Sequence, residues 1–453
     1  MMIILKNKKF ILLLLFSLLI ISIVFLVVCF GNFNFLKNGK YAGINLYFSP
    51  VNPLINTITA DSSNRLALMV EARNKHGNPV SGVLIKFNSY NNTGIFYPET
   101  VRTNEFGEAF VSYIPPDIID IKAVSFIQDE VYANEIDSSN STGNAAGNSG
   151  NSVLNFIGNS NNTNSEKSAM AEISLTAEVI RIKNIKSSIS FKLIPVPIIL
   201  VHGYQSTGEI FINMADYFNS VGLEPLSINY DSSKGVLSAA DELKDFLIEQ
   251  KSLYLSKGIQ IGKFDMVCHS MGGIVARYYT CSEDYIAYNN VRKIIFISVP
   301  HKGSHLAPIG AKYFEDQGVK DMMPESSLFV DIFPHMNNGG LNSTIQTGNI
   351  IGQFDEVVSP ESGILNDWGI DTYVFNLGNS NFSVDSFTDG DISKSAIHRV
   401  ILNNRKVFEK VVEMLNKNLP YPVFWESNLR KNIIKNVKYK ELCTSVWITL
   451  WFY

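Results

Sequence analysis

Cysteine and charge are both scarce in this chain of 453 residues. The four cysteines (Cys29, Cys268, Cys281 and Cys443) match the spacing of neither a metal site nor a disulfide framework. Only 18% of the residues are charged and the net charge is −4, whereas nucleic-acid binding leaves a basic excess. We therefore expect no nucleic-acid partner. The 46% of hydrophobic residues can bury a large core, and the length favours two or three domains.

An apolar run at residues 10–30 is long enough to span the hydrocarbon core of a bilayer, about 30 Å. Lys6, Lys8 and Lys9 precede it, which keeps the N-terminus cytoplasmic. A cleaved signal peptide is the alternative, but its apolar core usually has only about 7–15 residues and ends at a small-residue cleavage site. We predict that residues 1–31 are an uncleaved single-pass anchor in the cell membrane, with the rest of the chain extracellular.

Residues 52–193 show short strand-like segments separated by turn clusters, after a linker at 32–51. For example, residues 66–73 are followed by the Asn, Gly and Pro turn of residues 74–79. Such spacing predicts a β-sandwich. Residues 137–167 are mostly Asn, Ser, Gly and Thr, a composition that cannot offset chain entropy, and we expect a disordered loop inside this domain. A linker between two domains is the alternative.

Residues 194–418 alternate wholly apolar strands with helices. The run at 197–201 and the run at 291–299 are strand-like, and residues 237–255 have apolar positions at helical spacing. This pattern predicts an α/β fold with a mostly parallel sheet covered by helices on both faces. Ligands bind such sheets at the carboxyl ends of the strands, so we expect functional residues there.

The strand, turn and helix around Ser270 form the central motif. An apolar strand meets His269-Ser-Met-Gly-Gly273, and a helix-like segment follows. This order is typical of a nucleophile elbow, which exposes a serine hydroxyl above the sheet. Gly272 provides the small residue needed after the serine, whereas Cys268 stands where the pattern usually has glycine. We predict that Ser270 is a catalytic nucleophile.

A serine nucleophile needs a base and a carboxylate that orients the base. In this fold the chain order is serine, acid, histidine. His398 follows the last predicted strand and opens the last helix, so we predict that it is the base. Asp355 follows the next-to-last strand and is the first choice for the acid, with its neighbour Glu356 expected to point the other way. Asp389 is the strongest alternative.

The negative oxygen of the tetrahedral intermediate that follows attack by a serine needs N–H donors. We predict the backbone N–H of Met271, directly after the nucleophile, and that of Tyr204, in the loop after the first core strand. Gln205 is the rival of Tyr204, and the ring of His202 either orients the loop or is structural. We expect no cofactor and no metal.

With these residues in place, residues 194–418 resemble the lipase and esterase branch of the α/β-hydrolase superfamily. Val201-His-Gly203, His269-Ser-Met-Gly-Gly273, and Asp355 followed by His398 fall in the order of that family. Val299-Pro-His-Lys-Gly-Ser304 is similar to a segment of triacylglycerol lipases and of GPI-inositol-deacylase-like proteins. The resemblance implies an ester hydrolase, acting on acyl esters such as lipids through an acyl-enzyme, and the predicted anchor would attach it to the membrane.

The resemblance also implies a lid at residues 302–345. The apolar side chains there either contact an acyl chain or pack in the core. Residues 419–453 form a basic and aromatic tail to which the sequence assigns no role. The sequence also predicts no oligomeric state.

Part of the β-rich segment resembles bacterial Ig-like repeats of intimin- and invasin-type surface proteins. The likeness rests on residues 77–82 before a strand and on residues 103–110. It supports an alternative function, a surface adhesion or scaffold protein with an inactive hydrolase fold. Acyl transfer to an alcohol, by the same triad, is a further alternative.

Overall fold

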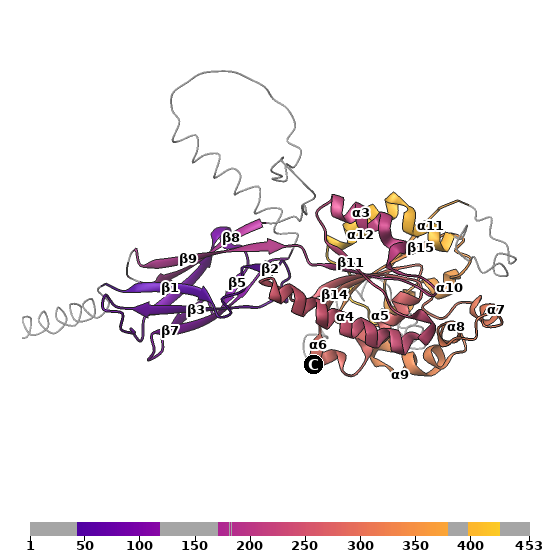
Figure 1. Cartoon of the computed structure of the whole chain (residues 1–453), viewed down its shortest axis with the longest axis horizontal. Helices are drawn as coiled ribbons and strands as arrows, with labels where there is room; N and C mark the ends of the chain where they lie inside the picture. The colour runs from indigo at the N-terminus through magenta and orange to yellow at the C-terminus, as the bar shows by residue number, and fades with distance from the viewer. Residues whose placement is uncertain (1–42, 118–170, 181, 183, 379–396, 426–453) are drawn as a thin grey trace, which may run out of the picture. The chain divides into compact units, whose positions relative to one another are not determined.

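The computed structural model describes residues 43–117, 171–180, 182, 184–378 and 397–425 (Figure 1). The predicted anchor, the Asn-rich loop at 137–167 and the alternative acid Asp389 lie outside the described residues. The chain divides into two compact units. The first contains Leu66–Tyr113, Ile173–Ser190 and the described residues up to Pro53. The second contains Leu54–Arg65 and the described residues of Ile114–Glu172 and Phe191–Tyr453.

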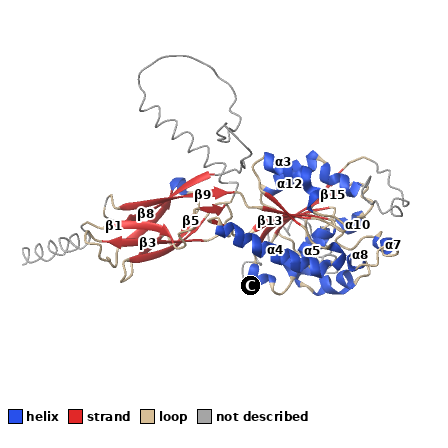
Figure 2. Cartoon of the chain, in the orientation of Figure 1, coloured by secondary structure: helices blue, strands red, loops and turns tan. Residues whose placement is uncertain are grey.

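The first unit is built from β-strands of two sheets (Figure 2). One sheet has the order β1-β3-β7-β5, and the other includes β9-β8-β4-β6. Their bounds are β1 (Asn45–Pro50), β3 (Leu66–Arg73), β4 (Leu84–Ser89), β5 (Ile95–Tyr97), β6 (Thr100–Arg102), β7 (Glu108–Ile114), β8 (Ala171–Val179) and β9 (Lys186–Ile194). β1 with β3, β3 with β7, and β4 with both β6 and β8 pair antiparallel.

Alternate side chains of these strands are buried, as expected for a sheet with one apolar face. The rings of Phe48 on β1 and Phe87 on β4 are 5.7 Å apart, so the two sheets pack face to face. Phe87 also stacks on Phe96, and Phe96 contacts Tyr113. The unit is therefore a two-sheet sandwich, and its likeness to Ig-like repeats remains a prediction.

The sandwich starts earlier in the chain than predicted. Residues Asn45–Pro50 form β1 and pair with β3, so this part of the predicted linker belongs to a sheet. Its signal is visible in the sequence, because buried Leu46 and Phe48 alternate with exposed neighbours. Residues Leu54–Arg65 cluster instead with the second unit. There β2 (Thr57–Thr59) pairs in parallel with the end of β9 and with β12 (Ile259–Gln260).

The second unit, the α/β unit, contains a six-stranded sheet with the order β11-β10-β13-β14-β15-β16. All neighbouring strands pair in parallel, which confirms the predicted parallel sheet. The strand bounds are β10 (Ile198–Val201), β11 (Pro225–Ile228), β13 (Phe264–His269), β14 (Val291–Ile297), β15 (Gln346–Gly352) and β16 (Thr372–Phe375). Every residue of β10 and β13 is buried, because both faces of the sheet are covered.

Helices cover the two faces of the sheet (Figure 1). α4 (Val236–Ser256) and α5 (Met271–Cys281) share one core cluster with Val201 and Met266. α3 (Ile212–Ser220) and α12 (Arg405–Leu415) share the other with Leu200 and Val267. Alternate residues of β10 and β13 thus face opposite helical layers.

The last helix differs from the prediction. His398 does not open it but lies in the separate short helix α11 (Ile397–Val400). The turn η8 (Ile401–Asn403) follows, and α12 begins after Asn404. The Asn404 side chain accepts a hydrogen bond from the N–H of Lys406, which makes it an N-cap and explains the break.

The α/β unit extends past residue 418 into the predicted tail. Leu419 is buried in the core, and the N–H of Trp425 donates to the carbonyl oxygen of Asp367. The rings of Phe424 and Trp368 are 5.3 Å apart. Within the ranges that the structure describes, no helix is both long and apolar enough to cross a bilayer.

Candidate active site

Ser270 lies in the turn between β13 and α5, at the carboxyl end of the parallel sheet. Its φ of 52° and ψ of −129° are values that residues with a side chain rarely adopt. The turn needs glycine at position 272, because a Cβ there would collide with the carbonyl oxygens of Val201 and His202. Strand and helix thus approach as closely as the predicted nucleophile elbow requires.

The loop after β10 runs directly beside the serine. A Cβ on Gly203 would lie 2.7 Å from the Cβ and 3.2 Å from the Oγ of Ser270. Tyr204 follows Gly203, and Met271 follows Ser270. Both predicted oxyanion donors therefore belong to residues that adjoin this contact.

The two candidate donors of the loop differ in their hydrogen bonds. The N–H of Gln205 already donates to Ser232 Oγ, 2.9 Å away, so it is occupied. The phenol of Tyr204 donates to Asp316 and holds the loop on its other side. This geometry favours Tyr204 over its rival.

The ring of His202 orients this loop. Its Nδ1 lies 2.9 Å from the carbonyl oxygen of Gly203, so Nδ1 carries the proton and donates. Its Nε2 accepts from the N–H of Tyr230, and the two rings stack with centroids 4.2 Å apart. Burial lowers the pKa of His202, which keeps the ring neutral in this arrangement.

Cys268 replaces the usual glycine without disturbing the turn. Its side chain is fully buried in the core cluster, between neighbouring strands at Val201 and Phe296. Burial raises the pKa of this thiol well above its usual range. The group therefore stays a thiol and acts as a small apolar residue.

Asp355 and His398 come together although they are 43 residues apart in the chain. Nδ1 of His398 lies 3.1 Å from Oδ1 and 3.0 Å from Oδ2 of Asp355. Both side chains are almost completely buried. Of the two adjacent carboxylates at 355 and 356, it is Asp355 that contacts the histidine.

The surroundings of Asp355 favour its ionised form. Burial is the largest single influence and acts to raise its pKa, but the charge and hydrogen bond of His398 together with the hydrogen bonds of Ser298 and Val358 outweigh burial, and the pKa lies below the ordinary 3.8. The N–H groups of Val357 and Val358 donate to Oδ1 over 3.0 Å and 2.9 Å. An ionised Asp355 fixes the proton of His398 on Nδ1 and leaves Nε2 as an acceptor.

His269 is a site residue to which sequence reasoning gave no role. Its Nε2 lies 2.8 Å from the backbone oxygen of His398. No sequence signal indicates this bond, because it joins residues 129 positions apart.

Several of the apolar side chains at 302–345 pack in the core, and others, such as Val330, are exposed. This segment contains the short helices α7 (Ala307–Gly310), α8 (Gln317–Asp321) and α9 (Phe333–His335). Met322, Leu328 and Phe333 are buried in the cluster that includes α4 and α5.

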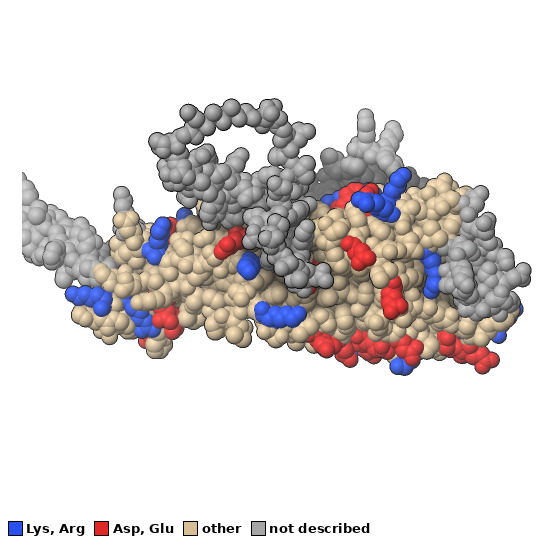
Figure 3. Space-filling view, turned by 45° about the horizontal axis from the view of Figure 1, so that its top comes forward, with Lys and Arg blue, Asp and Glu red and all other residues tan. Residues whose placement is uncertain are grey.

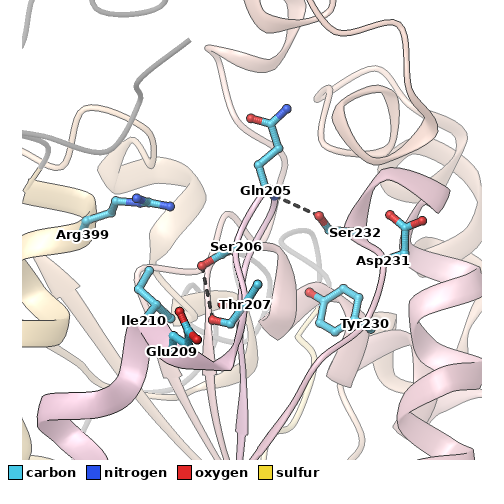
Figure 4. A pocket seen from close by; sticks show the side chains of 9 residues that line it. All are labelled: Gln205, Ser206, Thr207, Glu209, Ile210, Tyr230, Asp231, Ser232 and Arg399. Atoms are coloured by element: carbon cyan, nitrogen blue, oxygen red, sulfur yellow. Dashed lines mark hydrogen bonds between the residues drawn. The ribbon is translucent and has the colours of Figure 1, made fainter.

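A cavity of about 530 Å³ opens beside the loop after β10 (Figure 4). It is lined by Gln205, Ser206, Thr207, Glu209, Ile210, Tyr230, Asp231, Ser232 and Arg399. Arg399 faces Tyr230 and Asp231 from the opposite side. Most of these side chains are polar, whereas pockets that bind small molecules are usually lined mainly by apolar groups.

Charged side chains are unevenly distributed over the surface of the α/β unit. In the face shown in Figure 3, acidic side chains gather along one edge of the α/β unit and basic ones are scattered. Among the described residues, no three His, Cys, Asp or Glu side chains lie close enough to hold a metal ion.

Part of the α/β unit matches a known protein family. Residues 230–315, which include Ser270, match the family model described as PGAP1-like alpha/beta domain. Mature lipase BlEst2 of Bacillus licheniformis is similar in structure, with 18% identity, a TM-score of 0.35, and coverage of 49% of this chain and 91% of that one. A soluble variant of monoglyceride lipase from Saccharomyces cerevisiae is also similar, with 16% identity and a TM-score of 0.34. The match covers 49% of this chain and 84% of that one.

The comparison with solved structures also returns intimin. The D00-D0 domain of intimin matches with 11% identity and a TM-score of 0.19, covering 34% of this chain and 48% of that one. No curated protein matches the chain. The parallel sheet and the serine turn after β13 give the α/β unit an α/β-hydrolase-like fold, and the segment that matches the PGAP1-like model includes that turn.

Proposed function

We propose that this protein is a serine hydrolase that cleaves carboxylic esters, with lipids as the expected substrates. The observation that carries the proposal is the contact of His398 Nδ1 with both carboxylate oxygens of Asp355. A histidine oriented by a buried carboxylate is the base that a serine nucleophile needs. The elbow at Ser270 and the PGAP1-like match support the same class of reaction.

The chemistry follows from the roles of these groups. Ser270 Oγ attacks the ester carbonyl carbon while His398 Nε2 takes the hydroxyl proton. The N–H groups of Met271 and Tyr204 donate to the negative oxygen of the tetrahedral intermediate. Its collapse releases the alcohol, which takes the proton from His398, and leaves an acyl-enzyme. Water, deprotonated by His398, then releases the acid and restores the serine.

The location of the enzyme is also part of the proposal. Residues 1–31 anchor the chain in the cell membrane, and the α/β unit faces the outside. Activity should sediment with membranes and be lost from intact cells treated with external protease. A variant that lacks residues 1–31 should leave the membrane fraction, and its continued sedimentation would contradict the anchor.

The reaction is tested with the full chain in detergent micelles. Wild type should hydrolyse a short-chain nitrophenyl ester and react with a fluorophosphonate probe, and Ser270→Ala should do neither. Ser256→Ala, at the exposed end of α4, is the matched control and should behave as wild type. Labelling that persists in Ser270→Ala would contradict the nucleophile assignment.

Two further measurements separate related activities. Esters of increasing acyl length distinguish a lipase from a short-chain esterase. Product analysis with and without an added alcohol distinguishes hydrolysis from acyl transfer. A folded wild type that neither turns over nor becomes labelled would leave the adhesion or scaffold function.

A further inference from the structure

His269 precedes the nucleophile, and its ring is buried, with 3% of the residue exposed. Its Nε2 lies 2.8 Å from the backbone carbonyl oxygen of His398. A carbonyl oxygen only accepts hydrogen bonds, so Nε2 carries the proton and donates. Nδ1 of the same ring is then an acceptor.

This Nδ1 is buried and has no hydrogen-bond partner among the described residues. A buried acceptor without a partner is unfavourable, so an apolar side chain would fill this space with less loss of stability. The imidazole must therefore be useful through its other contacts. These are the Nε2 hydrogen bond and the contact with the ring of His398, whose centroid is 4.6 Å away.

The backbone of His398 needs such support. It lies in α11, which has four residues and is separated from α12 by η8 and Asn404. The long helix α12 therefore does not continue through the base. Asp355 holds the Nδ1 end of the His398 ring but not its backbone.

We propose that His269 is a positioning residue, which fastens the backbone of His398 to the serine turn and so fixes where the base lies relative to Ser270. This inference rests on the proposed function. The bond joins the residue directly before the nucleophile to the base itself, so the distance between them does not depend on the intervening chain.

The electrostatics of the pair suit this role. When His398 takes the serine proton it becomes positive, and a second cation in contact with it would oppose that step. Burial lowers the pKa of His269 well below 6.5, and the charge of His398 lowers it further. The hydrogen bond to the His398 carbonyl oxygen and the charge of Asp355 raise the pKa, and Arg399 lowers it, but burial is the largest effect. His269 thus stays neutral while the base is charged.

The test compares His269→Leu with His269→Gln in the full-length, detergent-solubilised protein. Leucine fills much of the space but cannot donate, whereas the glutamine amide is neutral and can donate to the same carbonyl oxygen. We expect His269→Leu to lower kcat roughly 10–100-fold with little change in KM, because a small misplacement of the base is sufficient for such a loss. His269→Gln should stay within about fivefold of wild type.

Active sites are counted by fluorophosphonate titration, and folding is checked by thermal unfolding. A merely structural role would lower the Tm of His269→Leu but leave kcat per titrated site unchanged, and that result would overturn the proposal. A folded His269→Gln that is as slow as His269→Leu would overturn it too. If His269→Leu does not fold, His269→Gln is the only test. A kcat within about fivefold of wild type would then support the proposal, and a much lower kcat would overturn it.

The two proposals fail in different ways. A wild type that neither hydrolyses the ester nor reacts with the probe contradicts the proposed function. An active wild type with an equally active His269→Leu contradicts the positioning role alone.

Discussion

The phenol of Tyr204 donates a hydrogen bond to Oδ2 of Asp316 over 2.6 Å. The other carboxylate oxygen, Oδ1, accepts from the N–H of Val319 and caps α8. Asp316 therefore ties the loop that carries the proposed oxyanion donor to the segment at 302–345. Tyr204 and Asp316 are 112 positions apart in the chain.

Tyr204→Phe should keep the fold but loosen this loop. We expect kcat to fall roughly 5–20-fold, equivalent to about 1–2 kcal/mol, with KM little changed. Ester hydrolysis per titrated site measures the effect. Tyr313→Phe, which removes the hydroxyl of a tyrosine that is 56% exposed, is the control and should match wild type. Equal activity of the two variants would show that the bond to Asp316 does not support catalysis.

Asp355→Asn tests the proposed acid. The N–H groups of Val357 and Val358 hold an oxygen at this position, so the asparagine would turn its NH₂ group toward His398. Nδ1 of His398 would then have to accept, and its Nε2 would carry the proton and could not act as a base. We expect kcat to fall roughly 10³–10⁴-fold with the fold retained, as ester hydrolysis and circular dichroism would show.

Asp389→Asn is the matched variant for the alternative acid. It should keep activity within a few fold of wild type, since Asp355 already contacts His398. A large loss in Asp389→Asn together with an active Asp355→Asn would reverse the assignment.

The stability of the protein should depend on Asp355 at acid pH. Its pKa is lowered in the folded protein, so its stabilising contribution is present above the pKa of the unfolded chain and is lost as the pH falls toward the folded pKa. The difference in unfolding free energy between wild type and Asp355→Asn should be constant above about pH 5 and shrink below about pH 4. Urea unfolding across this range measures it, and a difference that grows toward acid pH would be the wrong sign.

Gly203→Ala tests the closeness of the loop to the nucleophile. The added methyl would lie 2.7 Å from Ser270 Cβ, so the loop or the serine must shift. We expect kcat/KM to fall at least about 100-fold, because the donors and the serine lose their alignment. Gly310→Ala is the control, since its methyl would have only the side chain of Val319 within 4 Å, at 3.2 Å. Full activity of Gly203→Ala would remove the loop from the proposed mechanism.

Much of the α/β unit was predictable because its signals are local. Apolar strands alternate with helices, and the Gly272 turn follows a buried strand, so the sheet and the place of Ser270 follow from short segments. The chain order of the fold then directs attention to Asp355 and His398, which the structure brings into contact. The N-cap Asn404 was equally visible, and it would have indicated the break before α12.

The remaining features depend on pairing between distant segments. Residues Thr57–Thr59 pair with the end of β9 and with β12, and β12 is about 200 positions away. The contacts of Tyr204 with Asp316 and of His269 with His398 also need the folded chain. Periodicity and propensity describe single segments and carry no information about which of them meet.

The backbone of Ser270 has a consequence for how this sequence has been maintained. A residue held in such a conformation lowers stability by about 1–3 kcal/mol, and glycine would relieve most of that strain. Selection for a durable scaffold alone would therefore favour glycine at this position. Serine at this position is therefore less favourable to the fold than glycine, which is the trade-off that the proposed role of its hydroxyl would require.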